Sequence, residues 1–106
     1  MKYLSIFVML LFFALTIACG NKTEKGPKKV SGFFVFKEYC VSCHGVDGRM
    51  GLNGAKSIPD SKLNLEERIK HITNGKGTMQ PYKGILTEAE IKAVAAYSFE
   101  VGKEKK

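Results

Sequence analysis

The sequence predicts a small all-α domain of three to four helices. Two capping boxes, at 64–67 and 87–90, mark helix starts, because each pairs a side chain that accepts a backbone hydrogen bond with a glutamate three residues later that returns one. Apolar residues at helical spacing indicate an earlier helix from Ser31 to about Cys43. The stretches between these helices are broken by glycines and show no βαβ pattern. We therefore expect helices rather than a sheet.

A separate apolar segment, residues 1–18, opens the 106-residue chain. It holds 15 apolar residues and one charge, at Lys2, which is typical of an export signal peptide. The run Leu-Thr-Ile-Ala-Cys-Gly at 15–20 resembles the lipobox of bacterial lipoproteins, in which the cysteine, here Cys19, takes a diacylglyceryl group and becomes the new N-terminus. Cleavage elsewhere and an uncleaved signal anchor are the alternatives. We expect export to the periplasmic side and a membrane anchor at lipidated Cys19.

Residues 19–32 are predicted to be a lipid-anchored flexible linker. From Gly20 to Gly32 the chain has four lysines, one glutamate, three glycines and one proline, so it can bury little apolar surface. A flexible tether of about 13 residues would hold the domain within about 20 Å of the membrane. The lysines are interpreted as part of a solvated tether, and the alternative is that they lie on an anionic membrane surface.

Residues 33–106 are expected to form one domain, of a size at which a hydrophobic core often needs further support. Its helices should each turn an apolar stripe inward. In the first helix, capped by Ser31, the stripe is Phe33, Phe36 and Cys40. In the middle helix, which ends at Asn74-Gly75, it is Leu65, Ile69 and Ile72. In the last helix, which runs to about Gly102, it is Ile91, Val94, Ala95 and Ser98, flanked by Tyr97 and Val101.

The strongest chemical signal is the pentapeptide Cys40-Val41-Ser42-Cys43-His44. The pattern C-x-x-C-H is typical of c-type haem attachment. Two thiols one helical turn apart can each form a thioether with a haem vinyl group, and the adjacent imidazole of His44 then faces the iron. We therefore expect one covalent haem c, with iron bound by His44. The second ring N–H of this histidine needs a carbonyl acceptor, for which Pro59 is a candidate.

Two other uses of these cysteines were weighed against haem. A zinc site needs two further ligands, and once Cys19 is assigned to the signal only His71 remains. A thiol–disulfide active site would sit beside a βαβ pattern, which the sequence lacks. Export agrees with haem attachment, because the bacterial attachment machinery works outside the cytoplasm.

Glycines recur at every third position after the pentapeptide, at Gly45, Gly48, Gly51 and Gly54. A phosphate-binding loop would need a following Lys-Ser/Thr and a preceding strand, and neither is present. We interpret the glycines as a backbone that passes close to a flat cofactor.

From residue 31 to 101 the chain resembles the small class I cytochromes c. Gly32 and Phe36 stand eight and four residues before Cys40, like the glycine and aromatic residue on the first helix of that family. The segment 74–79 is similar to the family's methionine loop, and a last helix with Ala96-Tyr97 follows. The resemblance implies the small cytochrome c fold wrapped around one haem, with the aromatic residue at 97 packed near the glycine of the first helix.

The second axial ligand has four candidate answers: Met50, His71, Met79 or none. Met50 lies only six residues after His44, so the chain can hardly carry it to the opposite haem face. His71 projects away from the apolar stripe of its helix and is expected to be solvated. Met79 follows a glycine-rich loop, and the family resemblance selects the same residue. The family commonly has proline directly after this methionine, whereas here Gln80 intervenes.

Histidine and methionine ligation leaves iron no open position, which favours outer-sphere electron transfer over substrate chemistry. The predicted function is therefore a non-enzymatic, mono-haem electron carrier, tethered to the membrane and shuttling single electrons between respiratory-chain partners. The alternative is a haem-based ligand-binding sensor or a peroxidase-like module, in which the sixth ligand, Met79, is labile.

The net charge of the domain gives a weaker indication of its partners than the haem motif gives of its cofactor. Residues 33–106 hold 12 basic and 9 acidic residues, a net charge of +3, and no nucleic-acid recognition motif, so nucleic acid is not an expected partner. Lysines flank the haem-bearing segments and can steer an acidic redox partner: Lys37, Lys56, Lys76 and Lys83. We expect a monomer that meets a membrane-bound oxidase, reductase or peroxidase.

Overall fold

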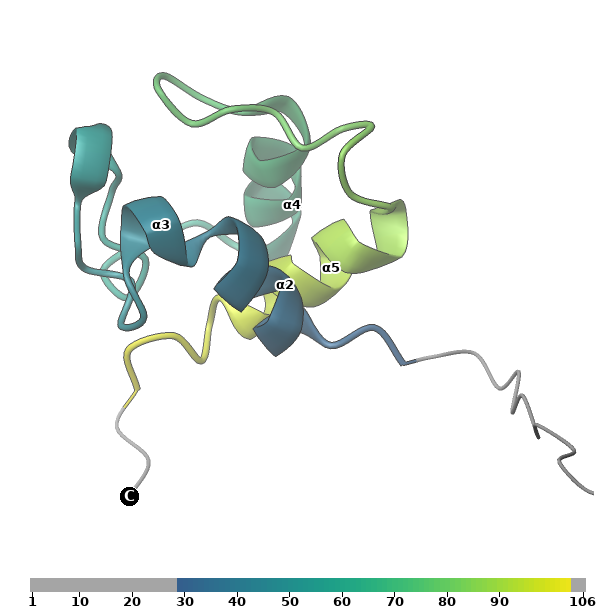
Figure 1. The fold of residues 1–106 in the computed structure, drawn as a ribbon, viewed down its shortest axis with the longest axis horizontal. Coiled ribbons are helices and arrows are strands. Elements are labelled where there is room, and N and C mark those ends of the chain that lie inside the picture. The colour runs from purple at the N-terminus through teal and green to yellow at the C-terminus, as the bar shows by residue number, and fades with distance from the viewer. Residues whose placement is uncertain (1–28, 104–106) are drawn as a thin grey trace, which may run out of the picture.

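The computed structural model describes residues 29–103. The predicted signal peptide, Cys19 and most of the predicted linker lie outside the described residues. Within 29–103 the order of elements is α2 (Gly32–Tyr39), α3 (Val41–His44), the 3₁₀ turn η1 (Leu52–Gly54), α4 (Leu65–Asn74) and α5 (Glu88–Tyr97) (Figure 1). This part of the chain has two isolated β-bridges and no strand, so the all-α prediction is confirmed. It also has no helix long and apolar enough to cross a membrane.

Helices α2 and α5 form the largest contact of the fold, and Gly32 lies at their closest approach. A Cβ atom on Gly32 would overlap the carbonyl oxygen of Ala93 and would lie 2.7 Å from Cβ of Tyr97. The Tyr97 ring then packs on Phe33 and Phe36, with centroids 5.8 and 5.6 Å apart. The packing that the family resemblance implies at this crossing is present.

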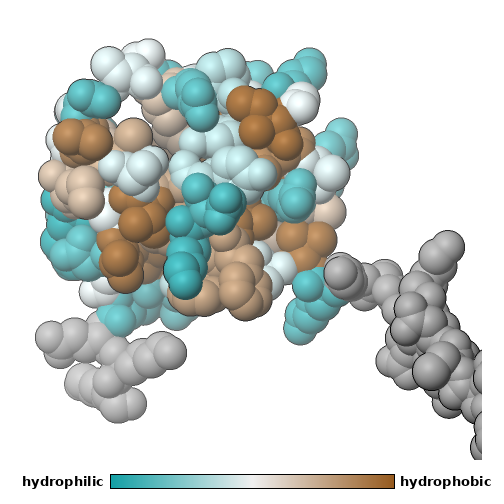
Figure 2. Space-filling view, in the orientation of Figure 1, coloured by the Kyte–Doolittle hydropathy of each residue, from teal (hydrophilic) through white to brown (hydrophobic). Residues whose placement is uncertain are grey.

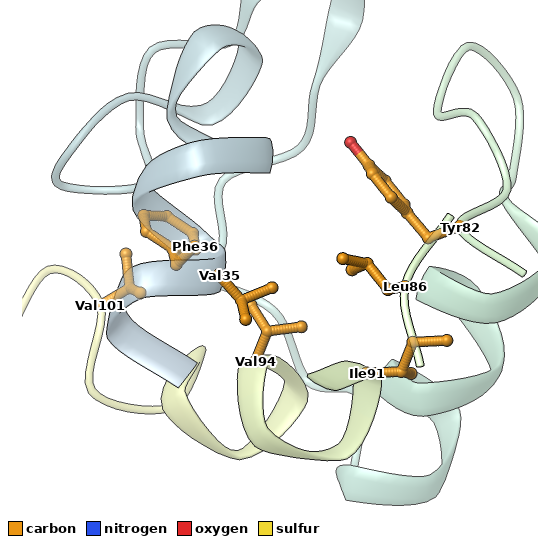
Figure 3. Packing of buried hydrophobic residues seen from close by; sticks show 7 residues of the cluster. All are labelled: Val35, Phe36, Tyr82, Leu86, Ile91, Val94 and Val101. Atoms are coloured by element: carbon orange, nitrogen blue, oxygen red, sulfur yellow. The ribbon is translucent and has the colours of Figure 1, made fainter. Parts of the chain in front are cut away.

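The core is built around the inner face of α5. The predicted stripe of this helix is confirmed, since Ile91, Val94, Ala95 and Ser98 are all buried. Figure 3 shows how side chains of α2 and of the segment before α5 converge on it. The buried cluster consists of Val35, Phe36, Tyr82, Leu86, Ile91, Val94 and Val101.

Both predicted capping boxes are present. The side chain of Asn64 accepts a hydrogen bond from the Glu67 amide at 3.0 Å, and Glu67 accepts one from the Asn64 amide at 2.8 Å. Thr87 and Glu90 form the same pair of bonds at the start of α5. Helix α5 ends at Tyr97 rather than near Gly102, and turns carry the chain onward so that Val101 still reaches the core.

The first predicted helix is divided at Cys40. This residue has φ −113° and ψ −31°, between α2 and α3, although hydrogen bonds continue across the break from the Cys40 amide to Phe36 O and from the His44 amide to Cys40 O. Ser31 precedes α2 without a side-chain cap. Phe33 was expected in the core but is 47% exposed, because it lies at the edge of the α2–α5 contact and Val35 takes the inner position.

Helix α4 also differs from its predicted stripe, since Leu65 is exposed and Arg68 is buried. The Arg68 guanidinium donates to Ser98 Oγ at 2.8 Å and to the carbonyls of Leu63 and Ser61 at 3.1 and 3.3 Å. It also lies over the Phe99 ring, 3.9 Å from the centroid. Among residues 29–103 no carboxylate pairs with it, and burial lowers its pKa. Hydrogen bonds and an aromatic face therefore allow this cation to replace an apolar residue between α4 and α5.

Candidate haem-attachment site

The two cysteines of the pentapeptide lie one turn apart at the α2–α3 junction. Cys40 occupies the junction and Cys43 follows on α3, with its amide 3.3 Å from Cys40 O. Both thiols are free and partly buried. Burial, and secondly the neighbouring Cys43 thiol, raise the pKa of Cys40 to about 11. The pair thus keeps the one-turn spacing that the sequence predicts.

His44, the last residue of α3, is held by a backbone carbonyl from a distant part of the chain. Its Nδ1 lies 3.1 Å from Lys56 O. Because a carbonyl oxygen can only accept, Nδ1 carries the proton and Nε2 keeps its lone pair for a metal. The acceptor predicted from the sequence, Pro59, is wrong. Pro59 instead packs beside Gly48 and Gly102.

A compact loop brings Lys56 to the histidine. Backbone hydrogen bonds from Met50 to His44 O at 2.8 Å and from Ile58 to Gly48 O at 2.9 Å close it. Gly48 has φ +75°, and a Cβ there would lie 2.7 Å from Cγ1 of Val101. Glycine at this position is thus required both by its left-handed backbone and by contact with the C-terminal turn.

Met79 lies in a tight turn that follows α4. Lys76 and Met79 exchange two backbone hydrogen bonds, each 3.0 Å long. Gly75 at the start of this turn has φ +68°, and a Cβ there would overlap the carbonyl oxygen of Met79. The Met79 side chain is partly buried and packs against the hydrophobic core, as do Cys40 and Val41. Met79 and Cys40 therefore adjoin one core.

Two hydrogen bonds that the sequence did not reveal connect the methionine segment to the rest of the site. Thr78 Oγ1 donates to Asn53 O at 2.9 Å, which joins the methionine turn to η1. Tyr82 Oη donates to Tyr39 O at 2.8 Å, at the end of α2. The one sequence signal for this region is the Asn-Gly pair at 53–54, since both residue types tolerate a positive φ. Asn53 is the one non-glycine residue in 29–103 with positive φ.

The other two ligand candidates are Met50 and His71. Met50 is 58% exposed. His71 is partly buried, and its Nδ1 bonds to Glu67 O at 3.0 Å within its own helix. In the described part of the chain no three His, Cys, Asp or Glu side chains gather as a metal site, so these residues provide no ligand set for zinc.

The donor set fits haem c. Two partly buried thiols stand one turn apart, the next residue offers a free imidazole Nε2, and a thioether packs on the same core. A small helical fold with these donors defines a c-type cytochrome.

Comparison with known proteins agrees with this class. A family model described as cytochrome C oxidase, cbb3-type, subunit III, matches residues 28–97. The chain is 36% identical over 73 residues to cytochrome c6 of Leptolyngbya boryana, an alignment that covers 63% of this chain and 85% of the relative. It is 30% identical over 105 residues to a cytochrome c6-like protein of Nostoc sp., covering 93% and 92% of the two chains.

A third relative is a subunit of a larger assembly. The chain is 34% identical over 89 residues to the cbb3-type cytochrome c oxidase subunit FixP of Bradyrhizobium sp., which covers 78% of this chain and 31% of that subunit. The chain belongs to the small mono-haem class I cytochromes c. Its cofactor is one covalently bound haem c with its iron.

Proposed function

We propose that this cytochrome c is a membrane-tethered carrier that shuttles single electrons between respiratory-chain partners. The observation that supports it best is that Met79, like Cys40 and Val41, packs against the buried core. When bound, haem c supplies a reversible one-electron couple between ferric and ferrous iron.

In this proposal four side chains hold the cofactor. Cys40 and Cys43 form its two thioether bonds, so that it cannot dissociate. The hydrogen bond that His44 Nδ1 donates to Lys56 O fixes the ring, so that Nε2 would hold the iron. Met79 supplies a neutral, soft sulfur ligand that favours the ferrous state. With His44 and Met79 both holding the iron, a substrate would have no open site, and the protein would act as a carrier rather than an enzyme.

The proposed location is the periplasmic side of a membrane, with a lipid on Cys19 and residues 20–32 as the tether. The lipobox-like run at 15–20 and the lysine-rich composition of the tether support it. Membrane-bound oxidases, reductases or peroxidases are the proposed partners, and the similarity to FixP favours an oxidase. A tether of this length makes encounters with such partners local.

Absorption spectra of the exported holoprotein test the axial ligands. We expect the oxidised parent to show the weak long-wavelength band of a methionine–ferric bond and the reduced parent not to bind carbon monoxide. Met79→Ala should lose the band and bind carbon monoxide, whereas the matched variant Met50→Ala, at an exposed methionine, should behave as the parent. A haem-loaded parent without the band and with rapid carbon monoxide binding would support the sensor or peroxidase-like alternative.

Mass spectrometry of the mature N-terminus tests the anchor. We expect the first residue to be Cys19 carrying a diacylglyceryl group. A mature chain that starts at any other residue, or that retains residues 1–18, would refute lipid anchoring while leaving the haem site unaffected.

A further inference from the structure

The outward face of α2 carries two exposed phenylalanines at its start. Its five exposed side chains are Phe33, Phe34, Lys37, Glu38 and Tyr39. Phe34 is 67% exposed, and the aromatic contact it makes is with the ring of Phe33, 5.4 Å away. Val30, just before the helix, is 36% exposed. We call Val30, Phe33 and Phe34 the aromatic face.

The fold itself does not require this face to be apolar. The Phe33 ring packs against Tyr97, whereas most of the Phe34 side chain faces solvent. Adjacent exposed phenylalanines on one short helix are unlike singly scattered surface apolar residues, and they indicate an interaction site.

The chain that precedes the aromatic face indicates its occupant. The structure begins at Lys29, and the candidate lipid attachment residue Cys19 lies only ten residues further back. As the tether proposed above, ten residues would have an end-to-end distance of about 17 Å. A lipid on Cys19 would therefore keep this end of the domain beside the bilayer more closely than any other part of the described chain.

The charge of the same segment complements an anionic lipid surface. Between Gly20 and Gly32 there are four lysines and one glutamate. Lysines next to apolar aromatic side chains are typical of segments that bind the headgroup region, where aromatic rings enter the interface and ammonium groups meet anionic lipids.

We propose that the aromatic face docks on the surface of an anionic lipid bilayer and so orients the domain relative to the membrane. The proposal extends the proposed function, since it rests on tethering at Cys19. In Figure 1 the start of α2 lies at the bottom of the domain, and the methionine segment, residues 75–81, lies at the top. Docking through the aromatic face would thus leave the methionine segment turned away from the bilayer.

Linear dichroism of haem absorption tests the orientation. Exported holoprotein is reconstituted in aligned bilayers of phosphatidylcholine with phosphatidylglycerol, and in bilayers of phosphatidylcholine alone. We expect a dichroic signal in the anionic bilayers, a loss of that signal in Phe34→Ser, and its retention in Phe34→Leu. The matched control is Ile85→Ser, which changes another exposed apolar residue, 53% exposed, and should leave the dichroism unchanged.

The outcomes separate docking from anchoring. If the parent stays in the bilayers but shows no dichroism, or if Phe34→Ser keeps the parent's signal, docking is wrong and the anchor stands. If mass spectrometry finds no lipid on Cys19, the anchor is wrong, and docking is then measured alone by cosedimentation with the same anionic vesicles. There Phe34→Ser should bind about tenfold more weakly. Equal binding of the parent and Phe34→Ser would overturn the proposal. Equal binding is also the result expected if the aromatic face bound a protein partner instead of lipid.

Discussion

Gly32→Ala should destabilise the protein, although alanine is normally the better helix former. In an ordinary helix interior the change gains about 0.5–1 kcal/mol. Here the added methyl would overlap the carbonyl oxygen of Ala93 and lie 2.7 Å from Cβ of Tyr97. A backbone atom cannot rotate away, so α2 and α5 must separate, and overpacking of this kind costs about 1–3 kcal/mol. Because Gly32 is the first helical residue, little propensity gain offsets that cost.

Thermal unfolding of the holoprotein, followed by far-UV circular dichroism, measures the effect. We expect a melting temperature lower by about 5–15 °C. Glu38→Ala, on the exposed side of the same helix, is the matched control and should change it little. The double variant Gly32→Ala with Ala93→Gly should not recover stability, because the overlapped atom is the backbone oxygen of Ala93. A melting temperature equal to or above the parent's in Gly32→Ala would refute the close crossing.

Three further predictions follow from hydrogen bonds of the fold. Thr78→Val removes the hydrogen bond to Asn53 O at 2.9 Å. In the proposed methionine-ligated form, this loss should lower the free energy of unfolding by about 0.5–1.5 kcal/mol. Guanidinium titration followed at the proposed methionine–iron band measures the effect, and an unchanged midpoint would contradict the prediction. Arg68→Ala should lower the free energy of unfolding by about 2–4 kcal/mol in the same titration, because three carbonyl or hydroxyl partners and an aromatic contact are lost. A decrease below about 1 kcal/mol would show that the cation is dispensable. Hydrogen bonds from the backbone N–H and then the hydroxyl of Thr87 lower the pKa of Glu90 below its ordinary 4.5. The stability that this carboxylate contributes is therefore present above pH 4.5 and is lost as the pH falls through the lower folded pKa. Glu90→Gln removes the titrating group and should flatten the acid limb of stability against pH, and an unaltered limb would refute the assignment.

Short-range chemistry explains which parts of the fold were predictable. The capping boxes were predicted correctly because their hydrogen bonds join residues three apart, so the sequence contains both partners. The inner stripe of α5 was also predicted correctly, since a helix buried on one side repeats its apolar residues every three to four positions. The predicted stripe of α4 failed at Leu65 because the partner of Arg68 is Ser98, thirty residues away.

In the candidate site, too, the local features were predicted correctly and a long-range contact was not. The pentapeptide 40–44 holds both thiols and the imidazole within two helical turns, so its local spacing alone predicted haem c as the cofactor. The turn at Met79 was favoured by its glycines and by the family resemblance. The carbonyl that holds His44 was predicted at Pro59 but lies at Lys56, because the loop closes through backbone hydrogen bonds, which do not depend on side-chain type.

The sequence by itself determined the class of this protein, since the helix starts and the cofactor signal at 40–44 both depend on neighbours within one or two turns. Only the tertiary structure decided which distant groups meet, among them Lys56 O at His44, Asn53 O at Thr78 and the cation of Arg68 at Ser98. It also decided that Phe33, which the helical spacing places in the core, is 47% exposed. The physical reason is that such contacts depend on how helices cross and how loops close. A close helix crossing, such as that at Gly32, fixes which face of each helix is covered and which is left exposed.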